Sequence, residues 1–149
     1  MGRAVIVSYA RTGLAKSGRG GFNDTHGATM TGHAIKHAVA RAGIEPELVE
    51  DVVIGCGAPE GATGSNIARL SLIRAGLPVT SSGTTVNRFC SSGLQAIAQA
   101  SHYIMNEGAK AAVGGGVESI SLVQLSGQAN RYRVTEEELM KTKPELWMA

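Results

Sequence analysis

Hydrophobic and polar residues along this chain follow two alternating periods, one typical of strands and one typical of helices. Short runs of β-branched and small apolar residues predict strands at residues 3–10, 50–57, 84–87 and 109–121. Apolar residues at helical spacing predict helices between them, at residues 29–42, 65–75 and 90–106. Because strand and helix alternate, we predict an α/β fold, a βαβαβαβ unit with a mostly parallel sheet and its ligand chemistry at the carboxyl ends of the strands.

The predicted helices carry recognisable end signals. Gly43 and Gly76 each follow a helical pattern and suit the left-handed conformation that commonly ends a helix. The third helix has an apolar stripe, and small apolar residues make its other sides apolar too, so we expect it to be buried on more than one face. The residues of the stripe are Leu94, Ile97, Ala98, Ile104 and Met105, and the small residues are Ala96 and Ala100.

The periodic pattern ends near Ser121. We therefore divide the chain into an α/β domain at residues 1–121 and the start of a loop region at residues 122–149. Thr135 and the acidic residues behind it predict a short helix that stops before Pro144. The apolar end, with Trp147, is unusual for a finished domain and predicts a truncated product.

Composition narrows the class of protein. Of 149 residues, 43% are hydrophobic and 17% are charged, which is typical of a soluble globular domain. The formal charge of +2 is spread without a basic block, and no apolar run reaches the length of a membrane span, so nucleic acid and membrane partners are not expected. Two cysteines and no signal-like segment favour a cytoplasmic location.

Three motifs suggest binding sites and fail on closer inspection. The sequence "GCGAPEG" has Glu60 where a dinucleotide-binding fingerprint needs glycine, and "LAKSG" has Ala15 where a phosphate-binding loop needs glycine. His33 and His37 are four residues apart on one helix, but no third metal ligand accompanies them. We therefore predict no metal site, no dinucleotide-binding fingerprint and no phosphate-binding loop.

The two cysteines have different sequence contexts. Cys56 ends a run of Val and Ile and is expected to behave as a small, inert, buried residue. Cys90 stands where an extended run gives way to a helix, and the unpaired N–H groups of a helix start favour a thiolate. Cys90 is thus the candidate catalytic nucleophile.

Four segments together resemble the thiolase family. "VNRFCSSGLQAI" is similar to its acyl-enzyme signature, and "ARTG", "ARLSLIRAGLP" and "GGGVESIS" follow the family's order. The resemblance covers nearly the whole chain and is nearer to the degradative 3-ketoacyl-CoA thiolases than to the biosynthetic acetoacetyl type. It implies a thiolase-like fold, acyl-CoA and CoA as substrates without a further cofactor, and assembly into a homo-oligomer, a dimer or a tetramer.

The resemblance also assigns roles and shows a departure. It implies that Cys90 takes the acyl group as a thioester, that its main-chain N–H helps to form an oxyanion hole, and that Gly93 permits close helix packing. Thiolases are longer chains, and their second half supplies histidine-bearing motifs and a second catalytic cysteine. Neither "GHP" nor "CxGGG" occurs in this sequence. We therefore expect an inactive, association-prone amino-terminal portion.

Alternatives to a thiolase are a ketoacyl synthase type of condensing enzyme, a thiol redox protein and a non-catalytic association fragment. The "GGGVESIS" segment and the spacing of Asn87 favour the thiolase.

Overall fold

A computed structural model describes residues 2–125, 137–143 and 145. The described helices and strands follow in the order α1 (Gly27–Ala42), β1 (Val49–Gly55), α2 (Ile67–Ala75), β2 (Ser82–Val86), α3 (Ser92–His102), β3 (Ala111–Gly116), α4 (Ile120–Val123) and α5 (Glu137–Thr142). Each of the three predicted helices and three of the four predicted strands is present, with ends that differ by a few residues. The α/β class is therefore confirmed.

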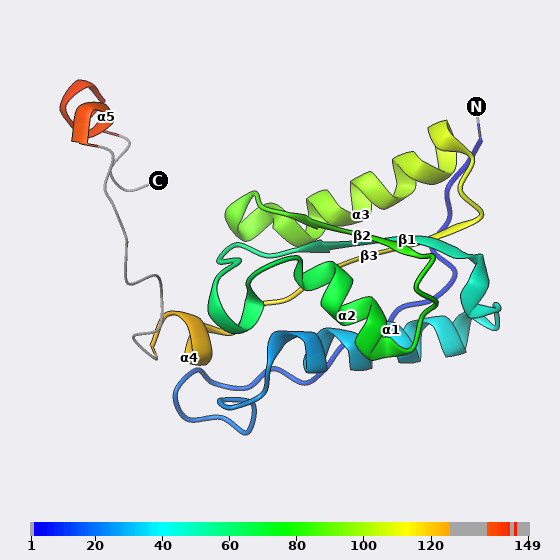
Figure 1. The fold of residues 1–149 in the computed structure, drawn as a ribbon, viewed down its shortest axis with the longest axis horizontal. Helices are drawn as coiled ribbons and strands as arrows, with labels where there is room; N and C mark the ends of the chain where they lie inside the picture. The colour runs from blue at the N-terminus through cyan, green and yellow to red at the C-terminus, as the bar shows by residue number, and fades with distance from the viewer. Residues whose placement is uncertain (1, 126–136, 144, 146–149) are drawn as a thin grey trace.

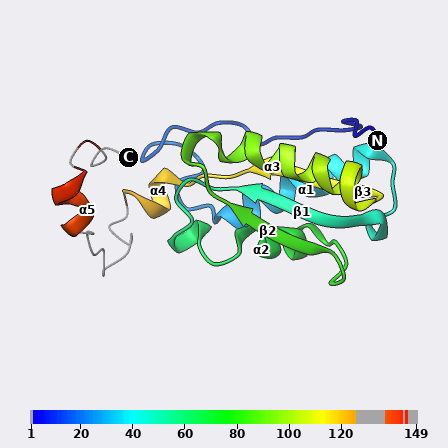
Figure 2. The same ribbon diagram turned by 90° about the horizontal axis from the view of Figure 1, so that it is seen from above.

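The strands form one sheet in the order β2-β1-β3, and both pairs are parallel. Helices α1 and α2 cover one face of the sheet, and α3 covers the other (Figure 1). Seen from above, α3 runs along the strands of the sheet (Figure 2). All three strands therefore end at the same edge, where the predicted chemistry was expected.

The two faces of the sheet bury very different side chains. Successive residues of a strand point to opposite faces, and Val52, Ile54 and Cys56 pack into the core shared with α1 and α2. Val53 points the other way and packs against Ala96 and Ala100 of α3. The face under α1 and α2 thus holds most of the large apolar core, whereas the α3 face is built from small residues.

The first predicted strand, at residues 3–10, is wrong. In the described part of the chain these residues are extended but pair with no strand. Val5, Ile6, Val7 and Tyr9 are exposed, and the Arg41 guanidinium donates a hydrogen bond to the Tyr9 carbonyl over 3.1 Å. A run of β-branched residues makes a segment competent for a sheet, but a strand also needs a free neighbouring backbone to pair with.

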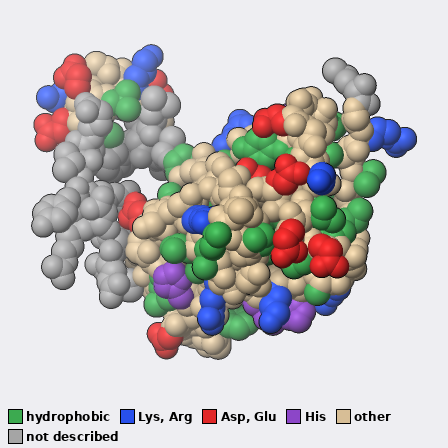
Figure 3. Space-filling model, turned by 45° about the vertical axis from the view of Figure 1, so that its right-hand side comes forward, with side chains coloured by type: hydrophobic (Ala, Val, Ile, Leu, Met, Phe, Trp, Pro, Cys, Tyr) green, Lys and Arg blue, Asp and Glu red, His purple; other side chains and the backbone are tan. Residues whose placement is uncertain are grey.

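The third helix differs from its prediction in two ways. Its α-helical part begins at Ser92, after a 3₁₀ turn at Phe89–Ser91, and residues 103–107 form a π-helical turn. The buried residues Ser92, Ala96 and Ala100 share one face, whereas Leu94 is 73% exposed and Ile97 is 43% exposed. The expectation of burial on several faces is therefore wrong for the described chain. Figure 3 shows further hydrophobic side chains at the surface.

The remaining carboxyl-terminal predictions are met in part. The fourth predicted strand ends at Gly116 rather than near Ser121, because Ser119 caps the short helix α4 by accepting a hydrogen bond from the Leu122 amide. Helix α5 confirms the short helix, although Thr135 and residues 146–149 lie outside the described residues. No helix among the described residues is both long and apolar enough to span a membrane.

Candidate functional site

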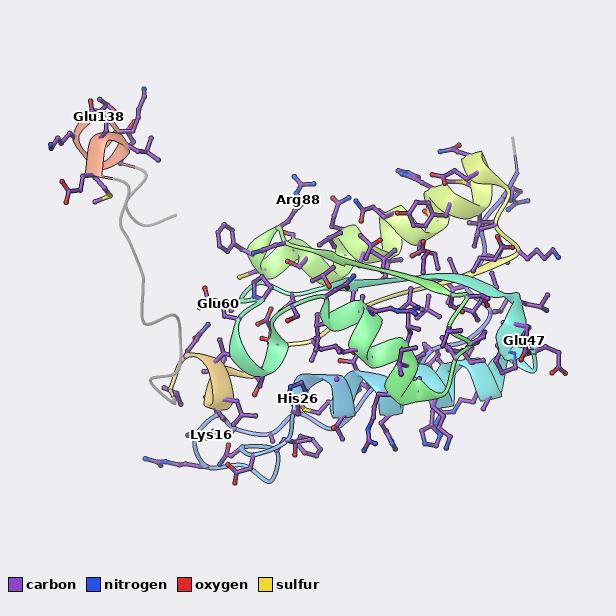
Figure 4. All side chains as sticks on the ribbon, viewed as in Figure 1. Lys16, His26, Glu47, Glu60, Arg88 and Glu138 are labelled. Atoms are coloured by element: carbon purple, nitrogen blue, oxygen red, sulfur yellow. The ribbon has the colours of Figure 1, made fainter. Side chains whose placement is uncertain are left out.

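Cys90 lies at the edge of the sheet where the strands end. Figure 4 shows Glu60 and Arg88 at this edge and Glu47, which precedes β1, at the opposite end of the molecule. Cys90 is the middle residue of the 3₁₀ turn Phe89–Ser91 that joins the end of β2 to α3. Its side chain is exposed and it forms no disulfide. The sequence therefore located the thiol correctly at a strand-to-helix junction, two residues before the α-helix proper.

The backbone just before the thiol is strained. Phe89 has a φ of +49°, a left-handed conformation that a residue with a Cβ rarely adopts. Such a conformation costs about 1–3 kcal/mol and persists only where surrounding contacts enforce it. Because the Phe89 side chain is itself 65% exposed, burial of the ring does not explain the strain. The contacts that enforce this backbone conformation are therefore the hydrogen bonds of the turn.

Ser92 supplies one set of these hydrogen bonds. Its hydroxyl accepts from the Arg88 amide over 2.8 Å and donates to the Phe89 carbonyl over 2.6 Å. The Arg88 guanidinium donates to the Gln95 side-chain oxygen over 2.7 Å, one further turn along α3. The first turn of the helix thus closes back on the segment that carries Cys90.

Asn87 and Glu118 supply a second set, and both act on Gly57. The Asn87 side chain accepts a hydrogen bond from the Phe89 amide over 2.8 Å and donates one to the Gly57 carbonyl over 3.2 Å. Glu118 accepts a hydrogen bond from the Gly57 amide. Asn87 follows the end of β2, Gly57 the end of β1 and Glu118 the end of β3. The parallel topology alone therefore brings these three residues together.

Glycines let α3 approach the sheet closely. A Cβ on Gly55 would lie 2.2 Å from the Ser92 carbonyl carbon, and one on Gly114 would lie 2.7 Å from the Cα of Ile97. Gly93 contributes less to this close packing than predicted, because a Cβ on Gly93 would come no closer than 3.9 Å to a neighbouring atom, the Cα of Gly116. The strand glycines Gly55 and Gly114, more than Gly93 of the helix, therefore allow the close packing behind Cys90.

Cys56 is buried, as predicted, on the opposite face of β1 from Gly55 and Gly57. Burial raises the pKa of its thiol from the ordinary value of 9.0, and the Glu118 carboxylate raises it further. Hydrogen bonds from Thr63 and the Ala58 main chain oppose this rise. Cys56 is therefore protonated at neutral pH and shielded from reagents.

The other sequence motifs stay apart from this site. His33 and His37 lie against each other on α1, with ring centroids 4.4 Å apart. Within the described residues, no three His, Cys, Asp or Glu side chains form a group that could hold a metal ion.

Two residues beside the Cys90 turn, Gly57 and Glu118, are not predicted from the sequence. Gly57 lies in "GCGAPEG" and Glu118 lies in "GGGVESIS", and neither segment by itself indicates a contact with the turn. One signal was available, because glycines alternate with larger residues in "VIGCG", which marks one strand face as a place for close backbone approach.

The chain matches the family model described as "Thiolase, N-terminal domain" over residues 4–147. It is 39% identical to a 3-ketoacyl-CoA thiolase of Bacillus subtilis (strain 168), covering all of this chain and 37% of that protein. It is 37% identical to an acetyl-CoA acetyltransferase of Cupriavidus necator, over 93% of this chain and 35% of that protein. The chain thus spans little more than a third of the length of these curated relatives.

Proposed function

This chain belongs to the thiolase family, and from that premise we propose that Cys90 is the nucleophile of an acyl transfer between a 3-ketoacyl-CoA and CoA. The supporting observation is the geometry of the Cys90 turn. An exposed thiol stands at the carboxyl edge of a parallel sheet, in a strained turn that hydrogen bonds hold from several sides. Packing alone does not require such strain, whereas reactive sites often store it.

The reaction proceeds in two steps. The Cys90 sulfur attacks the 3-keto carbon of the substrate, the bond between carbons 2 and 3 breaks, and acetyl-CoA leaves as an enolate that takes up a proton. The sulfur of a second CoA then attacks the thioester, and the bond from the acyl carbon to Cys90 breaks. The products are acetyl-CoA and an acyl-CoA shortened by two carbons, and Cys90 recovers its thiol. Reversal of both steps is a condensation of two acyl-CoA molecules.

The residues of the turn support particular parts of this reaction. Main-chain N–H groups at the start of a helix can stabilise the oxyanion that forms when the thiol attacks a carbonyl, and we assign this role to the Cys90 N–H. No base acting on the thiol is assigned to this chain. We therefore expect the 149-residue chain to accept an acyl group slowly and to show no measurable thiolysis, because a positioned acid or base contributes roughly 10²- to 10⁴-fold.

The test uses the Cys90→Ser variant, with Cys56→Ser as the matched control. After incubation with acetyl-CoA, peptide mass spectrometry of the wild-type chain should find an acetyl group on Cys90. Cys90→Ser should lose this adduct, since a hydroxyl is a poorer nucleophile at a site built for a thiol, and Cys56→Ser should keep it.

Turnover is measured on the longest chain that the gene encodes, with acetoacetyl-CoA and CoA as substrates. Cys90→Ser should abolish it. An acyl group found only on another residue would transfer the role. Peroxide oxidation of Cys90 without any acylation would favour the thiol redox alternative.

A further inference from the structure

Three strand ends are joined at Gly57. Its amide donates to Glu118, which follows β3, and its carbonyl accepts from Asn87, which follows β2. The other end of the Asn87 side chain accepts from the Phe89 amide, one residue before Cys90. A single chain of hydrogen bonds therefore runs from Glu118 through Gly57 and Asn87 to the turn that carries the thiol.

The same glycine also touches the turn directly. A Cβ at Gly57 would lie 3.0 Å from a Glu118 carboxylate oxygen and 3.3 Å from the Phe89 carbonyl oxygen. Both approaches are tighter than ordinary van der Waals contacts, so the position suits a residue without a side chain. Gly57 can thus serve as a short rigid spacer between Glu118 and the strained backbone of Phe89.

Given the proposed function, on which this step rests, we propose that Asn87 and Glu118 are positioning residues that hold the Cys90 turn in its reactive geometry through the main chain of Gly57. Neither side chain needs to touch the substrate. Asn87 fixes the Phe89 amide, and Glu118 fixes the strand end against which the Phe89 carbonyl rests.

Acyl transfer is sensitive to this geometry, whereas simple alkylation is not. Attack on a thioester needs the sulfur and the oxyanion-binding N–H in a fixed relation, and a misplacement of about 1 Å can cost on the order of a hundredfold in rate. Iodoacetamide needs only an accessible thiol. The ratio of the acylation rate to the alkylation rate of Cys90 therefore reports on positioning.

The test compares Glu118→Ala and Asn87→Ala with the control Glu60→Ala in the 149-residue chain. Glu60 is an exposed carboxylate on the loop after β1, and its main chain takes part in the hydrogen bonds of that loop. In both test variants, we expect the ratio of acetyl transfer from acetyl-CoA to alkylation by iodoacetamide to fall roughly tenfold or more. Glu118→Gln keeps an oxygen acceptor for the Gly57 amide and should restore most of the ratio, and Glu60→Ala should leave it unchanged.

Amide hydrogen exchange, measured by NMR, gives a readout that needs no acyl donor. Glu118→Ala should speed exchange at Gly57, and Asn87→Ala at Phe89, while Val52–Ile54 within β1 stay protected. Asn87→Asp keeps the acceptor for Phe89 and loses the donor to Gly57, so Phe89 should stay protected in that variant.

The outcomes separate the two proposals. An unchanged ratio, or unchanged exchange at Gly57 and Phe89, overturns the positioning role. Loss of protection at Val52–Ile54 in Glu118→Ala or Asn87→Ala also overturns it, because the residue then supports the whole fold. A further outcome is that wild-type Cys90 takes no acetyl group although amide exchange at Gly57 and Phe89 is still faster in the variants. That result would contradict acyl transfer at Cys90 and support the role of Asn87 and Glu118 in holding the turn.

Discussion

The two faces of the sheet differ in the size of the side chains that they bury. The face under α1 and α2 buries Val52, Ile54 and Leu72, together with Cys56, and removes a large apolar area from water. The face under α3 carries Val53 and Gly55 of β1 and then Gly57 just after the strand, so its side chains become smaller toward the edge where Cys90 lies. The first face supplies stability through burial, and the second brings one backbone close to another.

The comparison extends to the two cysteines, because Cys56 belongs to the core of the first face and Cys90 lies at the edge beside the second. Cys56 is buried among apolar side chains, and Cys90 is exposed in a turn held by hydrogen bonds. The proposed site at this edge needs backbone groups at fixed positions, and close backbone contact requires residues without side chains. The hydrophobic core beneath α3 is accordingly smaller, and Leu94 and Ile97 on α3 are exposed in the described chain.

The largest expected difference is in thiol reactivity. At neutral pH, iodoacetamide should label Cys90 at least about a hundredfold faster than Cys56, because reaction at Cys56 requires local or global opening of the fold. Quantitative peptide mapping over time measures both rates in one sample. Labelling in urea is the control, since unfolding should bring the two rates close together. Equal rates in the folded protein would contradict the assignment of the two environments.

The stability contrast is tested with two leucines. Leu72 is fully buried under the sheet and Leu94 is 73% exposed on α3. Leu72→Ala should lower the free energy of unfolding by about 2–5 kcal/mol, as other buried leucines do. Leu94→Ala should change it by less than about 0.5 kcal/mol. Urea unfolding followed by circular dichroism measures both, and a large loss in Leu94→Ala would mean that the α3 face carries an unrecognised core.

The backbone approach is tested with two strand glycines. A Cβ on Gly55 would overlap the Ser92 main chain, whereas one on Gly115 would meet only the Ile54 side chain at 3.6 Å. We expect Gly55→Ala to destabilise the fold by about 1–3 kcal/mol and to displace α3, with Gly115→Ala as the tolerated control. Urea unfolding gives the free energies, and the Cys90 acylation rate reports the displacement. Equal stability of the two variants would show that α3 does not need the close approach.

The smallest expected effect is a pH dependence of stability. The Cys56 thiol has a raised pKa in the folded protein, so the folded state holds this proton more tightly than the unfolded state. The resulting stabilisation is complete below the ordinary pKa of 9.0 and is lost as pH rises above it. Unfolding free energies between pH 8 and pH 10.5 should therefore fall more steeply for the wild type than for Cys56→Ala. Parallel slopes would show that Cys56 ionises equally in both states.

The sequence by itself determined the alternation of helices and strands, the carboxyl-terminal ends of the first two helices and the place of Cys90. These features follow from local rules. Helical periodicity specifies a helix wherever it occurs, and Gly43 and Gly76 end their helices in the left-handed conformation that local pattern predicts.

Only the tertiary structure decided which pattern became a strand and what surrounds the thiol. Residues 3–10 have a strand-like pattern without a paired neighbour, and Leu94 and Ile97 have an apolar pattern without a covering layer. Gly57, Asn87 and Glu118 are separated by 30 and 31 residues along the chain, and they meet only because three parallel strands end at one edge. Pairing and long-range hydrogen bonds depend on a partner elsewhere in the chain, and no local pattern contains that partner.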